Sequence, residues 1–169
     1  MLLKSAFLFF LIFWGCEKDD SQPIGKGFAL IESNQLEFET GALLSSSSNK
    51  FNFIFALKNE AGRVRIEMPM DNIPAEVGDH ALARNDGKGN SYAYLFTMDA
   101  DLSLDDYLLL EGEHNTISLT EINTAEQIVR GTFQLTFVRD MLLSAIKQDI
   151  FPDTIRLTDG TFETPYEKR

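Results

Sequence analysis

The chain has 169 residues and a formal net charge of −11, with 26 acidic and 15 basic residues. This length is enough for one ordinary domain once a leader and a linker are set aside. The excess of acidic groups repels phosphate backbones, so we expect no binding to nucleic acid. A single cysteine excludes a disulfide within the chain.

The first fifteen residues have the features of a secretory leader. Lys4 supplies a positive charge, and an uncharged apolar run from Ala6 to Trp14 follows it. This run is too short to span a bilayer as a mature helix. We therefore predict that residues 1–15 form a signal peptide. Its removal takes away Lys4 and no acid, so the net charge becomes −12.

The only cysteine follows this leader directly. The segment Phe13-Trp14-Gly15-Cys16 resembles the lipobox of bacterial lipoproteins, in which the leader is cut before a cysteine that carries diacylglycerol. Phe13 and Trp14 differ from the leucine and small residue that are usual there. A buried or reactive thiol is the alternative, but a cysteine at the end of a leader has no core around it. We predict that Cys16 is lipidated and that its lipid holds the protein at a membrane.

The charged residues behind the cysteine bear on where the protein is displayed. Lys18, Asp19 and Asp20 resemble the export signal of surface-exposed lipoproteins of Bacteroidetes, and the alternative is a solvated charged tether. The resemblance implies a lipoprotein of the outer membrane that faces the cell surface, with the periplasmic face as the alternative. Residues 16–26 are expected to be the lipidated cysteine and a flexible tether.

From Gly27 onward, apolar residues alternate with polar ones at the period of half-buried strands. The stripes expected to face a core are Leu36 and Phe38; Phe51, Phe53, Phe55 and Leu57; Val64, Ile66 and Met68; Tyr92, Tyr94, Phe96 and Met98; Ile117 and Leu119; Val129, Gly131, Phe133, Leu135 and Phe137; and Ile155 and Leu157. Turn residues separate these stripes, and Asp159-Gly160 is expected to break the chain between the last two strands. We predict one all-β domain over residues 27–169, an antiparallel sandwich or flattened barrel of roughly 8–10 strands.

One segment departs from this alternation. Apolar residues recur at helical spacing after Asp140, which is placed to cap a helix, and Pro152 is placed to stop it. The spacing predicts one short helix near 140–149, and an ordered loop is the alternative.

The C-terminal half contains two recognisable strings, Ile128-Val129-Arg130-Gly131-Thr132-Phe133 and Ile155-Arg156-Leu157-Thr158-Asp159-Gly160-Thr161-Phe162. They resemble a family of small Bacteroidetes lipoproteins of unknown function, in which a Gly-Thr-Phe strand precedes an Ile-x-Ile-Thr-x-Gly-x-Phe hairpin. Gly78-Asp79-His80-Ala81-Leu82 is similar to an earlier strand of that family, and the resemblance covers residues 64–164. It implies no catalytic residues.

A cluster of acids is the one weak candidate for a metal site. Asp99, Asp101, Asp105 and Asp106 follow one another closely, and calcium takes six to eight oxygen ligands. The EF-hand pattern fails, because leucines stand where its glycine and its bidentate glutamate belong. A solvated turn that protects a sheet edge is the alternative. We otherwise expect no metal and no cofactor.

The candidates for catalysis are weaker. Ser91 lies in a string similar to the nucleophile elbow of α/β-hydrolases, but a strand follows it where a helix is required. His80 and His114 have no partner at metal spacing. A triad of His114 with Ser118 or Ser91 has no support in the spacing. We therefore do not expect an enzyme.

These observations predict a non-catalytic binding or assembly module at the cell envelope, with a protein or glycan partner. A lipocalin-like carrier, with inward phenylalanines around an apolar ligand, is the alternative. Glycan binding is less favoured, because sugar rings usually stack on tryptophan and the only tryptophan, Trp14, is removed with the leader. Tyr92 and Tyr94 alternate as core residues do.

The lipid anchor can be tested directly. Cys16→Ser should leave the precursor uncut, because lipoprotein processing requires the modified cysteine first. Wild-type mature protein should partition into detergent. Replacing Lys18, Asp19 and Asp20 by Ala should leave lipidation intact but move the protein out of reach of protease added to cells. A free Cys16 thiol on a water-soluble wild-type protein would contradict the lipoprotein interpretation.

Overall fold

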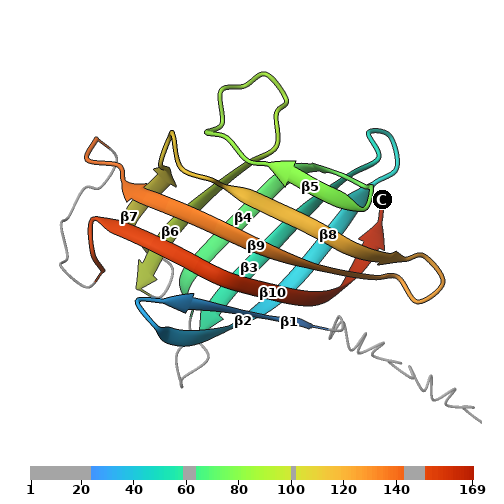
Figure 1. Ribbon diagram of the computed structural model, residues 1–169, viewed down its shortest axis with the longest axis horizontal. Coiled ribbons are helices and arrows are strands. Elements are labelled where there is room, and N and C mark those ends of the chain that lie inside the picture. The colour runs from blue at the N-terminus through green and yellow to red at the C-terminus, as the bar shows by residue number, and fades with distance from the viewer. Residues whose placement is uncertain (1–23, 59–63, 100–101, 143–150) are drawn as a thin grey trace, which may run out of the picture.

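The computed structural model describes residues 24–58, 64–99, 102–142 and 151–169 (Figure 1). The described residues form an all-β domain and contain no helix, which confirms the predicted fold class. Its ten strands are β1 (Gly25–Ile31), β2 (Asn34–Ser45), β3 (Lys50–Lys58), β4 (Val64–Pro74), β5 (Gly78–Ala81), β6 (Tyr92–Asp99), β7 (Leu102–Leu109), β8 (Thr116–Asn123), β9 (Ile128–Arg139) and β10 (Thr154–Lys168).

All ten strands belong to one sheet in the order β1-β10-β2-β3-β4-β6-β7-β9-β8-β5. The additional pairing of β10 with β9 closes the strands from β10 to β9 into a ring, and a second additional pairing joins β1 to β2. In Figure 1 the strands β8, β9 and β10 lie in front and cross obliquely over β2, β3, β4 and β6. The result is a flattened closed sheet whose two layers enclose the core.

The core between the layers is built from aromatic rings. Phe55 has its ring centroid 5.2 Å from that of Phe133 and 5.4 Å from that of Phe162. Phe53 lies 5.3 Å from Phe162, and Phe51 lies 5.2 Å from Tyr166. Most of these pairs are edge-to-face, the arrangement that the ring quadrupole favours. These contacts join β3 to β9 and β10 across the interior.

Most of the predicted stripes face this core. The central phenylalanines of β3, with Ile66 and Met68 of β4 and the stripe of β9, are buried. The stripe of β6 is the exception: Ala93, Leu95 and Thr97 are buried, whereas the larger Tyr92, Tyr94 and Phe96 face outward. Strand pairing imposes this orientation because directly paired residues share a face. Met70 pairs with Ala93 and Ile66 pairs with Thr97, and both β4 side chains point inward.

Four further features differ from the sequence-based expectations. The sheet is mixed, because β10 runs parallel to β2 where Tyr166 pairs with Ala42. β1 begins at Gly25, within the segment expected as a tether, because its backbone pairs with Thr40. Asp159-Gly160 does not separate two strands but forms a bulge within β10, where the register with β9 shifts. Met141 and Leu142 form an exposed turn, and the rest of the predicted helix, 143–150, lies outside the described residues.

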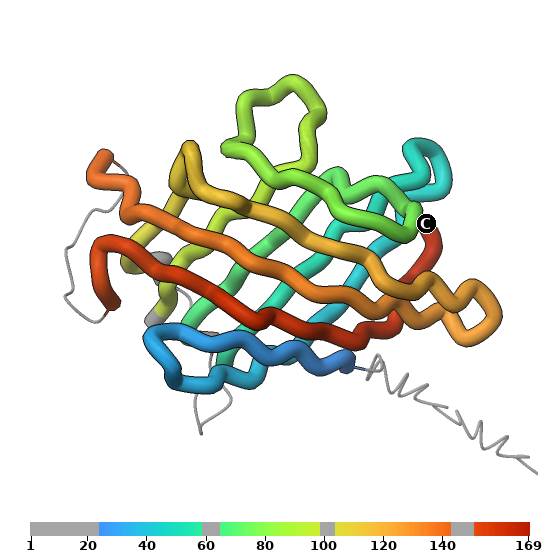
Figure 2. The backbone as a smooth tube through the Cα atoms, in the orientation of Figure 1, coloured from blue at the N-terminus to red at the C-terminus, as the bar shows by residue number. Residues whose placement is uncertain are grey.

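Figure 2 shows how the connections leave the closed body. Among the described connections, the loop between β5 and β6 projects furthest, and it contains the run 85–90 with its two glycines. The turn between β1 and β2 is only two residues long, with Glu32 and Ser33 both at positive φ (48° and 71°). This backbone matches the hairpin turn that usually takes Asn-Gly or Asp-Gly.

A prediction follows from the close approach of β8 and β10 at Gly131. A Cβ atom there would collide with the Ser118 carbonyl oxygen and lie 2.7 Å from the Phe162 ring. Gly131→Ala should therefore lower the free energy of unfolding by about 1–3 kcal/mol, as overpacking does. Urea-induced unfolding would measure this loss.

Gly41→Ala is the matched control, because the nearest heavy atom to its added Cβ is the Ile54 Cγ2 at 3.8 Å. Its stability should stay unchanged or rise slightly. Equal losses in the two variants would contradict the packing role of Gly131.

Candidate functional site

The outward stripe of β6 forms a ladder of nearly parallel aromatic rings. Tyr92 and Tyr94 have centroids 6.3 Å apart with an interplanar angle of 17°, and Tyr94 and Phe96 are 5.9 Å apart at 21°. All three side chains are half-buried. Aromatic side chains that stay partly exposed together on one strand are typical of binding surfaces.

The register of the sheet extends this ladder into rows across neighbouring strands. Ile54 of β3 pairs with Pro69 of β4, and Tyr94 of β6 pairs with Leu108 of β7. Pro69 lies opposite Tyr94, because its flanking residues Glu67 and Asp71 pair with Phe96 and Tyr92. The outward side chains therefore form a continuous apolar row over four strands. Ile54 is 44% exposed and is the most open member of this row.

Carboxylates lie on both sides of the row. Glu67 is beside Phe96, Asp71 is beside Tyr92, and Asp106 of β7 pairs with Phe96 from the other side. We call the surface made by the outward side chains of Ile54, Glu67, Pro69, Asp71, Tyr92, Tyr94, Phe96, Asp106 and Leu108 the aromatic face.

A shallow hollow of about 770 Å³ opens over one part of the aromatic face. Ile54, Pro69 and Tyr94 contribute its apolar lining, and Glu67 and Asp71 contribute carboxylates. The hollow reaches Leu43 on β2, which is itself 37% exposed. It has the size of a ligand site but is open to solvent along its length.

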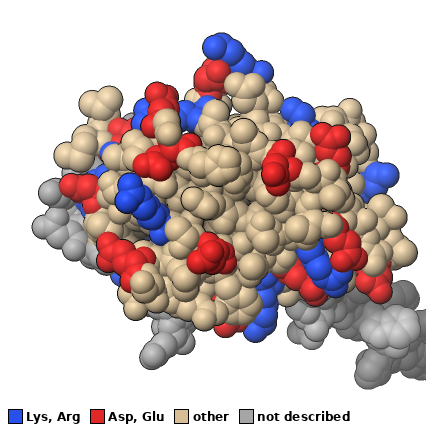
Figure 3. Space-filling model, in the orientation of Figure 1, with Lys and Arg blue, Asp and Glu red and all other residues tan. Residues whose placement is uncertain are grey.

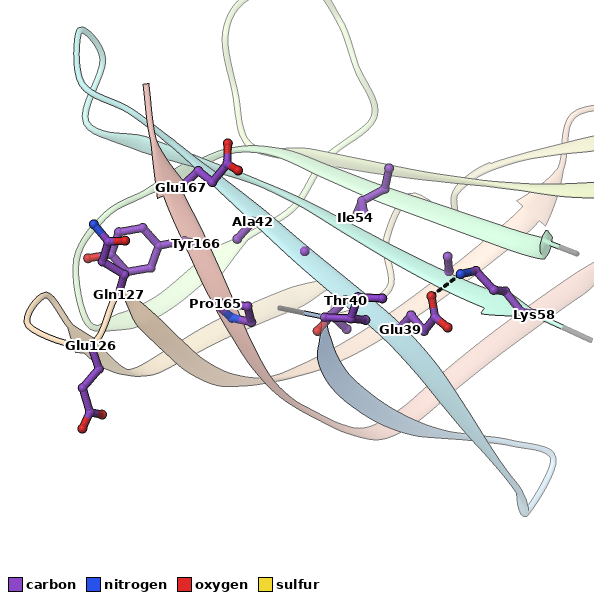
Figure 4. Close-up of a pocket in the computed structure, with 13 residues that line it drawn as sticks. Glu39, Thr40, Ala42, Ile54, Lys58, Glu126, Gln127, Pro165, Tyr166 and Glu167 are labelled. Carbon is purple, nitrogen blue, oxygen red and sulfur yellow. Dashed lines mark ion pairs between the residues drawn. The ribbon is translucent and has the colours of Figure 1, made fainter. Parts of the chain in front are cut away.

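A second hollow, of about 520 Å³, adjoins the first over β2 (Figure 4). It lies where the neighbour of β2 changes from β1, whose pairing ends at Thr40, to β10, whose pairing begins at Ala42. Figure 4 shows Pro165 and Tyr166 of β10 at this change of partner, with Ile54 on the far side. The gap between the two pairings leaves the surface concave.

The two cations that line these hollows, Lys58 and Arg169, each form an ion pair with a glutamate. Lys58 forms an ion pair with Glu39, drawn as a dashed line in Figure 4. Arg169 contacts Glu167, with 3.0 Å between Nη2 and Oε2. Such exposed pairs contribute little to stability, but they do neutralise the lysine and the arginine.

The carboxylates of the aromatic face are partly removed from water. Burial raises the pKa of Glu67 above its ordinary value. Burial also raises the pKa of Asp71, against the opposing effect of a hydrogen bond that the Tyr92 hydroxyl donates to it. The pKa of Asp106 is raised by burial and then by the charges of Asp140 and Asp105. Among the described residues, no cation contributes to these three shifts.

The same surroundings raise the pKa values of the two tyrosines of the ladder. Burial raises the pKa of Tyr92, and Asp71 adds to this increase through the hydrogen bond and its charge. Burial and the charges of Asp71 and Glu67 raise the pKa of Tyr94. Both phenols therefore remain neutral donors over the physiological range.

The opposite layer of the molecule has a different surface. Figure 3 shows that its face carries acidic and basic groups interspersed. Arg130 of β9 contacts Glu121 at 2.7 Å and Glu163 at 2.6 Å. Threonine and serine side chains alternate along these strands, and Ser118 donates a hydrogen bond to Asp79 at 2.5 Å. Several of the charges there are paired, as in the group of Glu121, Arg130 and Glu163.

The acids proposed for calcium lie in different surroundings. Asp105 is buried and forms an ion pair with Arg139, with 3.2 Å between its Oδ1 and the Nη1 of Arg139. Asp106 is the next residue of β7, so its side chain points to the opposite, outer face. Asp99 ends β6, and Asp101 lies outside the described residues. Within the described ranges, no three His, Cys, Asp or Glu residues form a metal-binding group.

Arg139 gives Asp105 a structural role. Its guanidinium also donates to the carbonyl of Phe151 and stands 5.5 Å from the centre of the Tyr107 ring, whose hydroxyl donates to Pro152. Removing one partner of such a buried pair is strongly destabilising, by about 3–5 kcal/mol. The pair ties the start of β10 to the junction of β7 and β9.

Most of the residues weighed for catalysis are engaged in other contacts, although His114 and Ser118 line one shallow hollow of the opposite layer. The Nε2 of His80 is 3.0 Å from the Glu76 carbonyl oxygen, and His80 is buried. Ser91 donates to the Asn72 carbonyl at 2.9 Å. His114 is exposed on the opposite layer, and the hydroxyl of Ser118 bonds to Asp79. These contacts do not assemble a nucleophile with a base.

Comparison with known proteins adds no relative. No protein-family model, no curated protein and no solved structure matches the chain. The leader, Cys16 and Lys18 to Asp20 lie outside the described residues, so their roles stay predictions. In the described part of the chain, no helix is long and apolar enough to cross a membrane.

Glu67 provides a test of the electrostatics of the aromatic face. Its raised pKa means that the folded protein holds this proton more tightly than the unfolded chain does. The stability that this group contributes is therefore present at low pH and lost as the pH rises through the raised pKa. Glu67→Gln should raise the free energy of unfolding only slightly at neutral pH, by less than about 0.5 kcal/mol, because solvent screens a carboxylate that is only partly buried. The gain should disappear at about pH 3.

Thermal unfolding at the two pH values would measure this difference. Glu32→Gln, in the exposed turn after β1, is the control and should leave stability unchanged at both. A loss of stability in Glu67→Gln at neutral pH would show that this carboxylate is engaged in a favourable contact.

Proposed function

We propose that the chain is an envelope-anchored lipoprotein that acts as a non-catalytic binding module. In this proposal the lipid on Cys16 holds the domain at the outer membrane, facing the cell surface, and the aromatic face contacts the partner. The sequence supports the anchor through the lipobox-like segment and the charged residues behind it. The geometry of β6 supports the binding role.

The observation that carries the binding role is the half-exposed ladder of Tyr92, Tyr94 and Phe96. A domain that needed these rings only for stability would place them in its core, as it does with the phenylalanines of β3. Tyrosines with a hollow beside them and polar groups around them resemble the centre of a binding surface.

The alternative of an internal carrier receives less support. A carrier needs a cavity of several hundred Å³ lined by its inward phenylalanines. Those phenylalanines instead contact one another at centroid distances from 5.2 to 6.5 Å. The two hollows over β2, of about 520 and 770 Å³, lie on the outer surface. The outer surface is therefore the better place to look for a ligand.

The binding role predicts that one side chain on the aromatic face dominates retention of the partner. Lipidated protein in uncharged detergent would be immobilised and exposed to detergent extracts of the cell envelope. Tyr94→Ser should reduce the material retained by about tenfold, the loss typical of a central interface tyrosine. Quantitative mass spectrometry would compare each retained component with wild type.

Phe28→Ser is the matched control, because Phe28 is a half-buried aromatic residue on the face that β1 and β10 share. It should retain the same components as wild type. Equal retention by all three proteins would contradict binding through the aromatic face.

A further inference from the structure

The outward stripe of β4 alternates charge and apolar surface at a fixed spacing. Glu67, Pro69 and Asp71 point to the same side because successive side chains of a strand alternate. Two residues four positions apart along a strand are separated by about 13 Å. The two carboxylates therefore lie about 13 Å apart, with the Ile54–Pro69–Tyr94 row between them.

No ion pair joins Glu67 or Asp71 to the bases around them in the described part of the chain. Arg65 lies on the same outward stripe, two residues before Glu67, but it is engaged in an interaction of its own and does not contribute to the pKa shift of Glu67. Lys58 and Arg169, which line the hollows, pair with Glu39 and Glu167. Glu67 and Asp71 have lost part of their water through burial without a described cation in exchange. A carboxylate in this condition gains most from a cation that arrives with a ligand.

We propose that the aromatic face binds an extended protein segment with Arg or Lys at positions i and i+4 and an apolar side chain at i+2. The two cations would meet Glu67 and Asp71, and the apolar side chain would enter the hollow against Pro69 and Tyr94. This inference rests on the proposed function and names the class of its partner.

The spacing of an extended ligand fits this stripe without distortion. Its residues i and i+4 are also about 13 Å apart, and residue i+2 projects from the same side. Each cation would lie beside an aromatic ring, because Glu67 is paired with Phe96 and Asp71 with Tyr92. A cation near such a ring gains a further attraction from the ring quadrupole.

A neutral glycan fits the face less well. Sugar hydroxyls could stack on Tyr94 and bond to the carboxylates, but they would leave the charges of Glu67 and Asp71 uncompensated in a partly dehydrated site. The third carboxylate, Asp106, adds to this negative charge. Charge complementarity therefore favours a basic segment over a neutral oligosaccharide.

The test uses lipidated protein in uncharged detergent and a fluorescent peptide that contains Arg-Ser-Leu-Ser-Arg. Fluorescence anisotropy should show saturable binding that weakens as salt rises, because partly exposed charge pairs are screened. A peptide with the order Arg-Arg-Ser-Ser-Leu, of the same composition, should bind about fivefold to tenfold more weakly. The sequence Glu-Ser-Leu-Ser-Glu should not bind.

Two double variants of the protein test which carboxylates contact the peptide. Glu67→Gln with Asp71→Asn should weaken binding of the peptide about tenfold, as expected for two partly exposed charge pairs. Glu121→Gln with Glu163→Gln removes the same charge from the opposite layer and should leave binding unchanged. Thermal unfolding of each variant would show that the protein remains folded.

Equal binding of the two arginine peptides, or equal loss in the two double variants, would overturn the inference. Binding of a neutral gluco-oligosaccharide in place of the peptides would also overturn it, in favour of a glycan partner. If no peptide binds while Tyr94→Ser still lowers retention of envelope components, the inference fails and the proposed function stands. If Tyr94→Ser changes neither measurement, both fail.

Discussion

Closure of the sheet by β10 is the constraint on which the rest of the structure depends. One edge of β10 pairs with β9 along most of its length, and the other pairs first with β1 and then with β2. These pairings satisfy backbone groups that an open edge would expose. Once the ring is closed, the pleat of every strand is fixed by its neighbour, and each side chain is assigned to the inside or the outside.

This assignment explains why the two layers have such different surfaces. The inside is filled by the phenylalanines of β3, β9 and β10, and β6 adds Ala93, Leu95 and Thr97 there but none of its aromatic rings. The larger rings of β6 then face outward, beside the carboxylates of β4. In the opposite layer, Arg130 forms ion pairs with both Glu121 and Glu163. The aromatic face is thus a consequence of closure as well as of composition.

The domain contains two kinds of carboxylate, which differ in burial and in charge compensation. Asp105 is fully buried and receives a permanent partner in Arg139, which joins β7 to β9 and to the start of β10. Glu67 and Asp71 are only half-buried, and no described cation lowers their pKa values. Partly dehydrated carboxylates beside exposed aromatic rings are unfavourable for the free protein, and a ligand can relieve that condition.

The sequence by itself determined the fold class and most of the core, because apolar residues that recur at every second position identify the buried stripe of a strand when only one stripe is apolar. It failed at β6, where both stripes are apolar and only the pairing with Ile66 and Met70 selects Ala93, Leu95 and Thr97 for the interior. It also could not reveal the Glu32-Ser33 turn, which lacks glycine, or the bulge at Asp159-Gly160. The candidate site was hidden for the same reason: its side chains come from β3, β4, β6 and β7, and only tertiary pairing places them in one row.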